Sequence, residues 1–424
     1  MSPVGDVAPA SFPDAVGMGG AVEMTTITMK EDLRGEFQVV GLVSFAHLLS
    51  HLYMLVLPPF FSQLRQDLGV DYIQLGLTVT ALSVTTGLLQ TPMGFLVQRY
   101  GGRRVLIGGL FVNSLAIGLV GFVTTYWQLM GLMLLAGVGS SVFHPADYAI
   151  LNARVDTKRL GRALSVHALG GNLGFVVAPP IMVLLAVAMD WRMATIAIGG
   201  VGVLLAVIML ALSSVLGDSG KTKGREGDSW KKLVTSPKVM LLFAFYALSS
   251  AANSGMVYFS VVAFTDIYAI PAAVAASALT AYQLLAMMAV LPGGWLADRA
   301  KNPELLLCVC FLASGALIVI SGLGVAPFWL VVVLIGAAGA MRGLVNASRD
   351  VSVRHAATDV SVGTLFGFVT MGYSGGQMLG PALYGWLLDS GHPQLVFWAS
   401  AAFSTLAIGT MVTGRIWRLR AAAA

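Results

Sequence analysis

Charged residues are scarce in this chain of 424 residues: Asp, Glu, Lys and Arg make up only 11% of it, whereas soluble globular domains carry about a quarter. Hydrophobic residues account for 57%, and the mean hydropathy is +0.82. A disordered chain would show the opposite balance, with few apolar and many charged residues. The composition therefore excludes an ordinary soluble enzyme and a disordered protein, and it predicts a polytopic membrane protein.

Cysteine is also scarce. Cys308 and Cys310 lie two apart within one apolar run, a spacing that points side chains to different faces of a helix, so no disulfide is expected between them. No metal-type cysteine spacing is present. The first 36 residues lack a long apolar core and hold several acidic side chains, unlike a signal peptide. We expect residues 1–37 to form a mobile cytoplasmic tail.

Long polar segments are missing from residues 38–214 and 239–415, which contain twelve apolar runs. Each run is long enough for a helix that crosses a bilayer, which needs about 20 apolar residues. The predicted spans are 38–64, 73–97, 104–124, 127–151, 161–188, 193–214, 239–264, 272–296, 304–324, 327–348, 361–388 and 393–415. The predicted fold is an all-α integral membrane protein of 12 transmembrane helices in two pseudo-symmetric six-helix bundles. A cytoplasmic linker, 215–238, joins the bundles, and a cytoplasmic tail, 416–424, ends the chain.

Basic residues are nearly absent from one set of connections. Of the 25 Lys and Arg residues, 23 belong to the side that holds the N-terminus, in its tails, loops and adjoining helix turns, and only Arg65 and Arg192 fall outside it. The positive-inside rule then predicts a multi-pass protein of the cell inner membrane with both termini in the cytoplasm. Because the charges sit in short loops, the net charge of +5 does not indicate a nucleic-acid partner. We expect a monomer whose partners are the lipid bilayer, protons and a small-molecule substrate.

The two predicted bundles carry a weak internal repeat. With an offset of 202 residues, Gly174 aligns with Gly376 and Asp147 with Arg349. The loops after the second and eighth spans also match, 94–99 against 294–299. Paired six-helix halves are typical of one large class of secondary transporters.

Several motifs resemble the major facilitator superfamily. Its loop signature, G-x-x-x-D-R/K-x-G-R-R/K, is similar to residues 94–104, with Gln98 in place of aspartate, and a second copy keeps Asp298 and Arg299. Segments 57–59, 137–145 and 170–174 resemble the fosmidomycin-resistance-like branch. The resemblance covers about residues 38–415. It implies alternating access by rocking of the halves, driven by a proton gradient, with no enzymatic activity and no cofactor.

The resemblance assigns a gating role to this loop signature. Gly94 lets helices approach, and an acid at a helix end can meet the positive N-terminus of a neighbouring helix. Gln98, beside Arg99, brings no charge, so the lock of the first half should be weak. Asp298, beside Arg299, is expected to act against the start of the fifth helix.

A second gate is predicted from the repeat. Asp147 and Arg349 occupy related positions at the expected inner ends of the fourth and tenth helices, which line the cytoplasmic mouth in this fold. We predict an ion pair between the halves that closes the cytoplasmic side and breaks when it opens. Arg349 could instead pair with Asp350 or extend to the membrane surface.

The direction of transport is indicated by a proline motif. Residues 174–180 resemble the family's antiporter motif G-x-x-x-G-P, except for Ala178, and 376–381 is a closer copy. Small residues permit close helix crossing and proline permits a bend. The motif favours proton-driven export, and proton-symport uptake of an organic anion is the alternative.

Ionisable side chains inside the predicted spans are few, and such groups are functional candidates by default. His47 and His51 share one face of the first helix, His144 and Asp147 share one face of the fourth, and His167 lies in the fifth. We interpret His144 and Asp147 as a proton-coupling unit, with His51 as a second site in the central cavity, because histidine titrates near neutrality. His47, His51 and His167 could equally be neutral histidines bonded to a neighbouring helix.

Arg342 lies about two turns inside the predicted tenth helix. A guanidinium that faces an otherwise apolar cavity suits a carboxylate or phosphonate, so we expect an anionic or amphiphilic substrate. The other candidate substrate-binding residues are polar or aromatic side chains within spans, each of which can also serve helix packing: His51, Tyr53, Asn253, Tyr258, Gln283, Asn346, Tyr373 and Gln377.

The leading hypothesis is a proton-coupled secondary transporter of a small organic compound. A metal-ion transporter that uses His47, His51, His144 and Asp147 as ligands is an alternative, and a non-transporting receptor with the same fold is a third. An intramembrane hydrolase is not predicted, because the chain contains no G-x-S-x-G or H-E-x-x-H motif.

Overall fold

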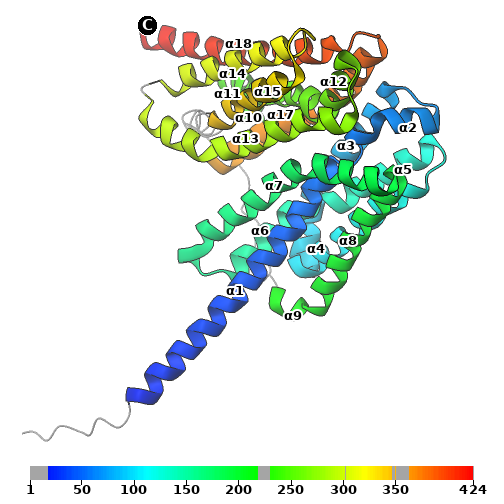
Figure 1. Cartoon of the computed structure of the whole chain (residues 1–424). Coiled ribbons are helices and arrows are strands. Elements are labelled where there is room, and N and C mark those ends of the chain that lie inside the picture. The colour runs from blue at the N-terminus through cyan, green and yellow to red at the C-terminus, as the bar shows by residue number, and fades with distance from the viewer. Residues whose placement is uncertain (1–17, 218–229, 301, 346–348, 350–361, 424) are drawn as a thin grey trace, which may run out of the picture.

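The computed structural model describes residues 18–217, 230–300, 302–345, 349 and 362–423, and all regular elements in this part of the chain are helical. Each of the twelve ranges predicted as spans contains a helix. Helices dominate because a segment in lipid has no water to bond its backbone and must satisfy its own N–H and C=O groups. Figure 1 shows the two halves of the chain as two helix bundles packed against each other.

The elements of the first half are α1 (Met18–Met54), η1 (Pro58–Phe60), α2 (Phe61–Leu68), α3 (Tyr72–Tyr100), α4 (Gly102–Leu119), η2 (Val120–Phe122), α5 (Tyr126–Ser140), α6 (Phe143–Arg154), α7 (Thr157–Met189), α8 (Trp191–Ala211) and α9 (Ser213–Leu216). Those of the second half are α10 (Trp230–Thr235), α11 (Pro237–Ser254), the π-helix η3 (Gly255–Phe259), α12 (Ser260–Tyr268), α13 (Ala272–Arg299), α14 (Pro303–Ser321), α15 (Phe328–Leu344), α17 (Val362–Asp389) and α18 (Gln394–Ala423).

Nine segments of the described residues are long and apolar enough to cross a membrane. One of them, Thr157–Ala211, contains both α7 and α8, and Phe328–Leu344 is a shorter apolar helix. The chain is therefore a multi-pass membrane protein, and the count of twelve crossings stays a prediction.

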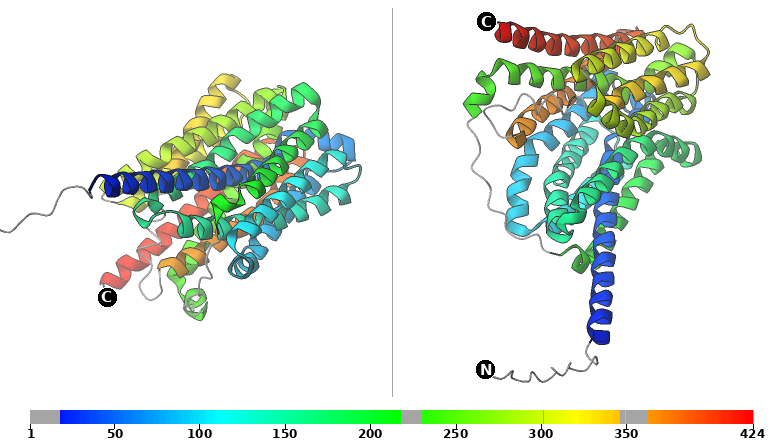
Figure 2. Two further views of the ribbon diagram at one scale, coloured as in Figure 1. Left: turned by 90° about the horizontal axis from the view of Figure 1, so that it is seen from below. Right: turned by 90° about the vertical axis from the view of Figure 1, so that its left-hand side faces the viewer.

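The N-terminal boundary differs from the expected one. Helix α1 begins at Met18, within the range expected to be a tail, and extends well beyond the bundle (Figures 1 and 2). Within α1, Glu36 is held against α7, because its carboxylate accepts hydrogen bonds from Nε and Nη2 of Arg159 at 2.8 and 2.7 Å. A polar helix of this kind gives no apolar signal in the sequence, so its start was missed.

The two ends of the bundle differ in charge and in contacts. The end where α3 and α4 meet carries Arg99, Arg103 and Arg104, and we call it the basic end. The end that carries α2 and the connection from α4 to α5 is called the opposite end.

At the opposite end the halves are joined directly. Asp389 of α17 accepts hydrogen bonds from the backbone N–H groups of Tyr72 and Ile73, at 3.0 and 2.8 Å, in the first turn of α3. One turn further along α3, a Cβ at Gly76 would lie 2.2 Å from the carbonyl oxygen of Pro381, so only glycine permits this approach. These contacts hold the two halves together at the opposite end.

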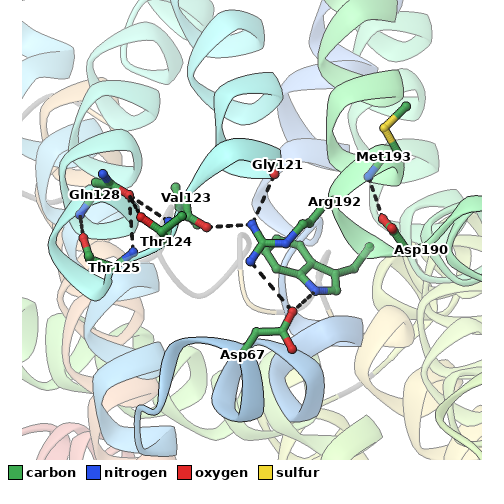
Figure 3. A network of polar contacts seen from close by, with 10 residues as sticks. Asp67, Gly121, Val123, Thr124, Thr125, Gln128, Asp190, Arg192 and Met193 are labelled. Atoms are coloured by element: carbon green, nitrogen blue, oxygen red, sulfur yellow. Dashed lines mark hydrogen bonds and ion pairs between the residues drawn. The ribbon is translucent and has the colours of Figure 1, made fainter.

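A polar network also fixes the opposite end of the first half (Figure 3). Nη1 of Arg192 donates to the carbonyl groups of Val123 and Gly121 at 2.6 and 3.3 Å, and its Nη2 lies 3.8 Å from Asp67. The indole N–H of Trp191 donates to the same carboxylate at 2.8 Å. Arg192 thus joins α2, α8 and the connection from α4 to α5.

Candidate functional site

A cavity of about 1060 Å³ lies between the two halves. Its walls come from α3, α6 and α7 of the first half and from α10, α11, η3, α13, α15 and α17 of the second. This volume is at the upper end for small-molecule sites. The predicted residues that line it are His144, Asn253, Tyr258, Gln283, Arg342, Arg349, Tyr373 and Gln377.

The wall of this cavity is cationic. Arg342 and Arg349 line it, and none of its described lining residues is an aspartate or a glutamate. Arg342 is half-buried, with Nη1 3.5 Å from the carbonyl oxygen of Ser249. The guanidinium of Arg349 lies over the ring of Tyr246, 4.9 Å from its centroid. Both cations therefore belong to the second half, on one wall of the cavity.

A polar network of the second half reaches this wall from the π-helix η3. The hydroxyl of Tyr258 donates to Oε1 of Gln377 at 3.1 Å, and Nε2 of Gln377 donates to the hydroxyl of Tyr373 at 3.5 Å. π-Turns inside helices are rare and occur often at functional sites. A Cβ at Gly255, the first residue of η3, would lie 2.5 Å from the ring of Tyr384, so glycine permits the wider turn that positions Tyr258.

Behind the wall of the first half lies a second group of ionisable side chains, which we call the histidine–aspartate cluster: His47, His51, His144, Asp147 and His167. Asp147 is completely buried, and its Oδ2 lies 3.4 Å from Nδ1 of His47 and 3.6 Å from Nε2 of His167. The ring centroid of His47 is 4.4 Å from that of His51 and 5.3 Å from that of His144. Of these five residues, His144 alone lines the cavity.

Small residues of α7 bring this cluster together. A Cβ at Gly171 would lie 2.7 Å from the ring of His47, and one at Gly174 would lie 2.3 Å from the carbonyl oxygen of Leu48. Any larger residue would push α7 away from α1 and separate His167 from His47. The segment 170–174, first noticed as a branch motif, thus has a packing role.

The fourth predicted span is interrupted, and the break orients α6, the helix that carries His144 and Asp147. Helix α5 ends at Ser140 and α6 begins at Phe143, so the chain turns just before His144. Pro145 lies in the first turn of α6. Proline has no backbone N–H, and in the first turn of a helix this costs no hydrogen bond, because N–H groups there have no partner within the helix. Asp147 follows one turn later and points into the interface with α1 and α7.

Several polar atoms of the cluster have no hydrogen-bond partner: both carboxylate oxygens of Asp147, Nδ1 of His47 and both ring nitrogens of His167. A buried carboxylate is unfavourable without a proton or a cation beside it. His47, Asp147 and His167 offer ligand types that suit a metal ion, and their ligand atoms lie within 4.8 Å of one another. A tetrahedral metal ion with bonds of about 2.0–2.1 Å to its ligands holds the ligand atoms about 3.4 Å from one another. The separations of 3.4 and 3.6 Å at Asp147 meet this condition, and the group as a whole is looser than a preformed zinc site.

Two predicted pairings are corrected by these positions. The carboxylate of Asp147 lies beside His47 and His167 rather than His144, because it turns towards α1 and α7. The ion pair between Asp147 and Arg349 is absent from this conformation, since Asp147 is buried in the first half while Arg349 lies over a ring of the second.

Two predicted substrate contacts lie elsewhere. Tyr53 is 1% exposed, and its hydroxyl donates to Oγ of Ser114 and to the carbonyl oxygen of Ile198, both at 3.1 Å, so it packs in the core of the first half. His51 does not line the cavity; its ring is 4.4 Å from that of Phe175, which does. Asn346 lies outside the described residues.

The loop-signature residues lie at the basic end, as their charges suggest. Gln98 and Arg99 are exposed there at the end of α3, and a Cβ at Gly94 would touch only Pro145 at 4.0 Å. Arg299 is exposed and stacks on the ring of Trp295 at 4.3 Å. The side chain of Asp298 lies outside the described residues, so the gating roles stay predictions.

Seven polar lining residues were not identified from the sequence: Gln90, Thr91, Tyr148, Asn172, Tyr246, Thr370 and Ser374. Tyr148 could have been found, because it lies one turn after His144 on the same helix face. Asn172 lies within the recognised segment 170–174. Nothing in the sequence around Gln90 and Thr91 distinguishes a polar side chain that faces the cavity from one that packs against a neighbouring helix.

Two bundles around a central cavity, in a chain with many apolar helices, define a membrane transporter. A family model described as the Major Facilitator Superfamily matches residues 43–268 and 247–422. The chain belongs to this superfamily.

Individual relatives are more distant. A protein named as a probable L-galactonate transporter of Escherichia coli strain K12 is 28% identical over 166 residues, which are 39% of this chain and 37% of that protein. The fosmidomycin resistance protein of the same organism is 25% identical over 195 residues, 46% of each chain. The chain thus matches less than half the length of these relatives. The crystal structure of a bacterial homolog of the human lysosomal transporter Spinster, inward-facing and occupied, superposes with a TM-score of 0.74 at 14% identity, covering 89% of this chain and 96% of that one.

Proposed function

We propose that this protein is a proton-coupled secondary transporter that moves a small, anionic or amphiphilic organic compound across the cell inner membrane by alternating access, in the direction of export. The observation that carries the proposal is the cavity between the halves, with two guanidinium groups and no carboxylate among its described lining residues. Two fixed positive charges in a partly desolvated space favour an anionic ligand, and a guanidinium pairs with a carboxylate or a phosphonate in bidentate geometry. A relative named as an L-galactonate transporter is consistent with an anionic cargo.

The orientation follows from the placement of charge. We assign the basic end to the cytoplasm, because 23 of the 25 Lys and Arg residues fall in the tails, loops and adjoining helix turns on that side. Contacts from Asp389 to α3 close the opposite end. On this assignment, the end that Asp389 holds together faces the exterior.

Proton coupling is assigned to the histidine–aspartate cluster. The titratable groups beside Asp147 are His47 from α1 and His167 from α7. The rings of His51 and His144 pack against His47, and the ring of Tyr148 packs against His167. Protons reach the cluster from the cavity through His144, which is exposed, and are held between Asp147 and the two buried histidines beside it. A proton shared among these groups removes the cost of an unpaired buried carboxylate.

Export is favoured by the two proline motifs in α7 and α17. In α17, a Cβ at Gly376 would lie 2.2 Å from the carbonyl oxygen of Ala247, so the motif glycine permits tight packing against α11. Uptake of the anion together with a proton is the alternative, and the sign of the flux under an imposed pH gradient separates the two.

The proposal is tested with purified protein in liposomes. Arg342→Gln should abolish anion counterflow, whereas Arg162→Gln, which removes an exposed guanidinium elsewhere, should leave it intact. Asp147→Asn should abolish transport driven by a pH gradient but retain counterflow, because exchange does not require net proton movement. Asp71→Asn, at the opposite end, is the matched carboxylate control. Full activity of Arg342→Gln would exclude the anion site, and pH-driven flux in Asp147→Asn would exclude the proton site.

The metal-ion alternative rests on the ligand types of His47, Asp147 and His167. It predicts flux of zinc or manganese into the same liposomes, abolished by Asp147→Asn. Organic-anion counterflow without any metal flux would decide in favour of the proposed function.

A further inference from the structure

Neutral amides are placed on both walls of the cavity. Gln90 and Asn172 line it from the first half, and Gln283 and Gln377 line it from the second. Each amide presents two N–H donors and one carbonyl acceptor with two lone pairs. The cavity therefore offers directional hydrogen-bonding groups on both sides, in addition to the positive charge of Arg342.

These amides differ in how far the protein itself satisfies them. Gln377 is held between Tyr258 and Tyr373, and Nδ2 of Asn172 donates to the carbonyl oxygen of Ala168 at 3.0 Å. Gln90 and Gln283 form no side-chain hydrogen bond with any described residue. Gln90 is exposed and Gln283 half-buried, so water can bond both while the cavity is open.

Alternating access removes that water. When the halves close around a cargo, the amides on facing walls lose solvent, and a polar group left without a partner is unfavourable. A purely apolar carboxylate would leave Gln90 and Gln283 unsatisfied. A cargo with several hydroxyl groups would satisfy both, because each hydroxyl donates one hydrogen bond and accepts others.

We propose that the cargo is a polyhydroxylated carboxylate, whose hydroxyl groups bind Gln90 in one half and Gln283 in the other while its carboxylate faces Arg342. This assignment rests on the proposed function and names the substrate class of the same cavity. The apolar lining residues, such as Phe175 and Met287, face the C–H groups of such a molecule. Contacts from both halves also make closure depend on the cargo, since neither wall alone completes the site.

The test compares three ligands on the full-length protein in lipid nanodiscs, by calorimetry. Gluconate and hexanoate have the same carbon number and the same carboxylate, but hexanoate has no hydroxyl groups. Sorbitol has the hydroxyl groups without the charge. We expect gluconate to bind at least about tenfold more tightly than either. A site built to bond hydroxyl groups rejects hexanoate, which lacks them, and sorbitol lacks the carboxylate that pairs with Arg342.

Variants assign the effect to the amides. Gln283→Leu and Gln90→Leu keep the side-chain volume and should each weaken gluconate binding about tenfold, the loss of one or two hydrogen bonds, while leaving hexanoate binding unchanged or tighter. Met287→Leu, one turn from Gln283 on the same wall, is the matched control and should affect both ligands alike.

The outcomes separate the two proposals. If gluconate and hexanoate bind equally and both depend on Arg342, the hydroxyl assignment is wrong and the anion transporter stands. If sorbitol binds as tightly as gluconate and both are weakened by Gln283→Leu, the amide contacts are supported but the need for a carboxylate is refuted. Tighter binding of hexanoate, or unchanged gluconate binding in both leucine variants, overturns the inference.

Discussion

The bond between Asp389 and the start of α3 should control which side of the transporter is open. Its two carboxylate oxygens accept N–H groups of Tyr72 and Ile73, at 3.0 and 2.8 Å, that the helix itself cannot satisfy. The carboxylate comes from the second half and the helix from the first, so opening the opposite end must break both bonds. Asp389→Asn keeps one acceptor and removes the charge that favours a helix N-terminus.

The size of the effect follows from these contacts. Caps are worth about 0.5–2 kcal/mol, and an exposed charge at a helix terminus about 0.3–1 kcal/mol. Asp389 is exposed, so solvent reduces the electrostatic part, and about 1 kcal/mol is expected for the asparagine variant. That energy changes the ratio of the two conformations about fivefold in favour of the form open at the opposite end.

The assay is a distance distribution between spin labels at Trp127 and Val325, exposed residues at the opposite end of the two halves, in a background without native cysteines. The population with the longer separation should grow about fivefold in Asp389→Asn. Asp190→Asn is the matched control, because Asp190 caps α8 by accepting from Met193 at 2.9 Å within one half. Unchanged distances in Asp389→Asn, or an equal shift in Asp190→Asn, would refute the reasoning.

Three further substitutions probe the packing that supports the site. Gly174→Ala should lower the free energy of unfolding by about 1–3 kcal/mol, because the added methyl group overpacks against α1, and the melting temperature should fall. Gly161→Ala is the control and should leave the melting temperature unchanged, because a Cβ there meets nothing within 4 Å. Trp191→Phe removes one hydrogen bond at the opposite end and should cost about 1 kcal/mol in chemical unfolding; no change would indicate that water replaces it. Glu36→Gln breaks the bidentate pair with Arg159 and should increase amide hydrogen exchange in the first turns of α7; equal exchange would show that this pair does not hold the two helices.

Apolar length alone predicted where the helices lie, because a lipid-crossing segment has few alternatives to a helix. The same signal could not show where helices break within a span. The change from α5 to α6 before His144 and the π-helix that contains Tyr258 occur inside continuous apolar runs. Such breaks are set by local packing of glycine and proline against neighbouring helices, which the hydropathy pattern does not record.

The candidate site was less predictable than the fold. Arg342 was identified because an arginine in a span has few structural uses. Tyr53 was misassigned because every face of a membrane helix is apolar, so the sequence does not show which face meets the cavity. The partners of Asp147 could not be derived either. His47 and His167 lie about 100 and 20 residues away in the chain, and they meet Asp147 only because glycines of α7 permit close packing on α1.

Helix α17 joins the cavity to the closed end and explains how cargo binding can change the conformation. Gln377 faces the cavity. The carbonyl group of the next residue, Met378, accepts a hydrogen bond from the hydroxyl of Thr80 in α3 at 2.7 Å. Three turns later in α17, Asp389 caps the start of α3. A cargo that draws Gln377 towards the first half must therefore move the residues that hold the opposite end closed. Helix α7 has the corresponding position in the first half, with Asn172 at the cavity and His167 beside Asp147. Under the proposed function, cargo and proton would act on two helices that both continue to the opposite end, so the occupancy of each site would bias the same opening without any contact between the two ligands.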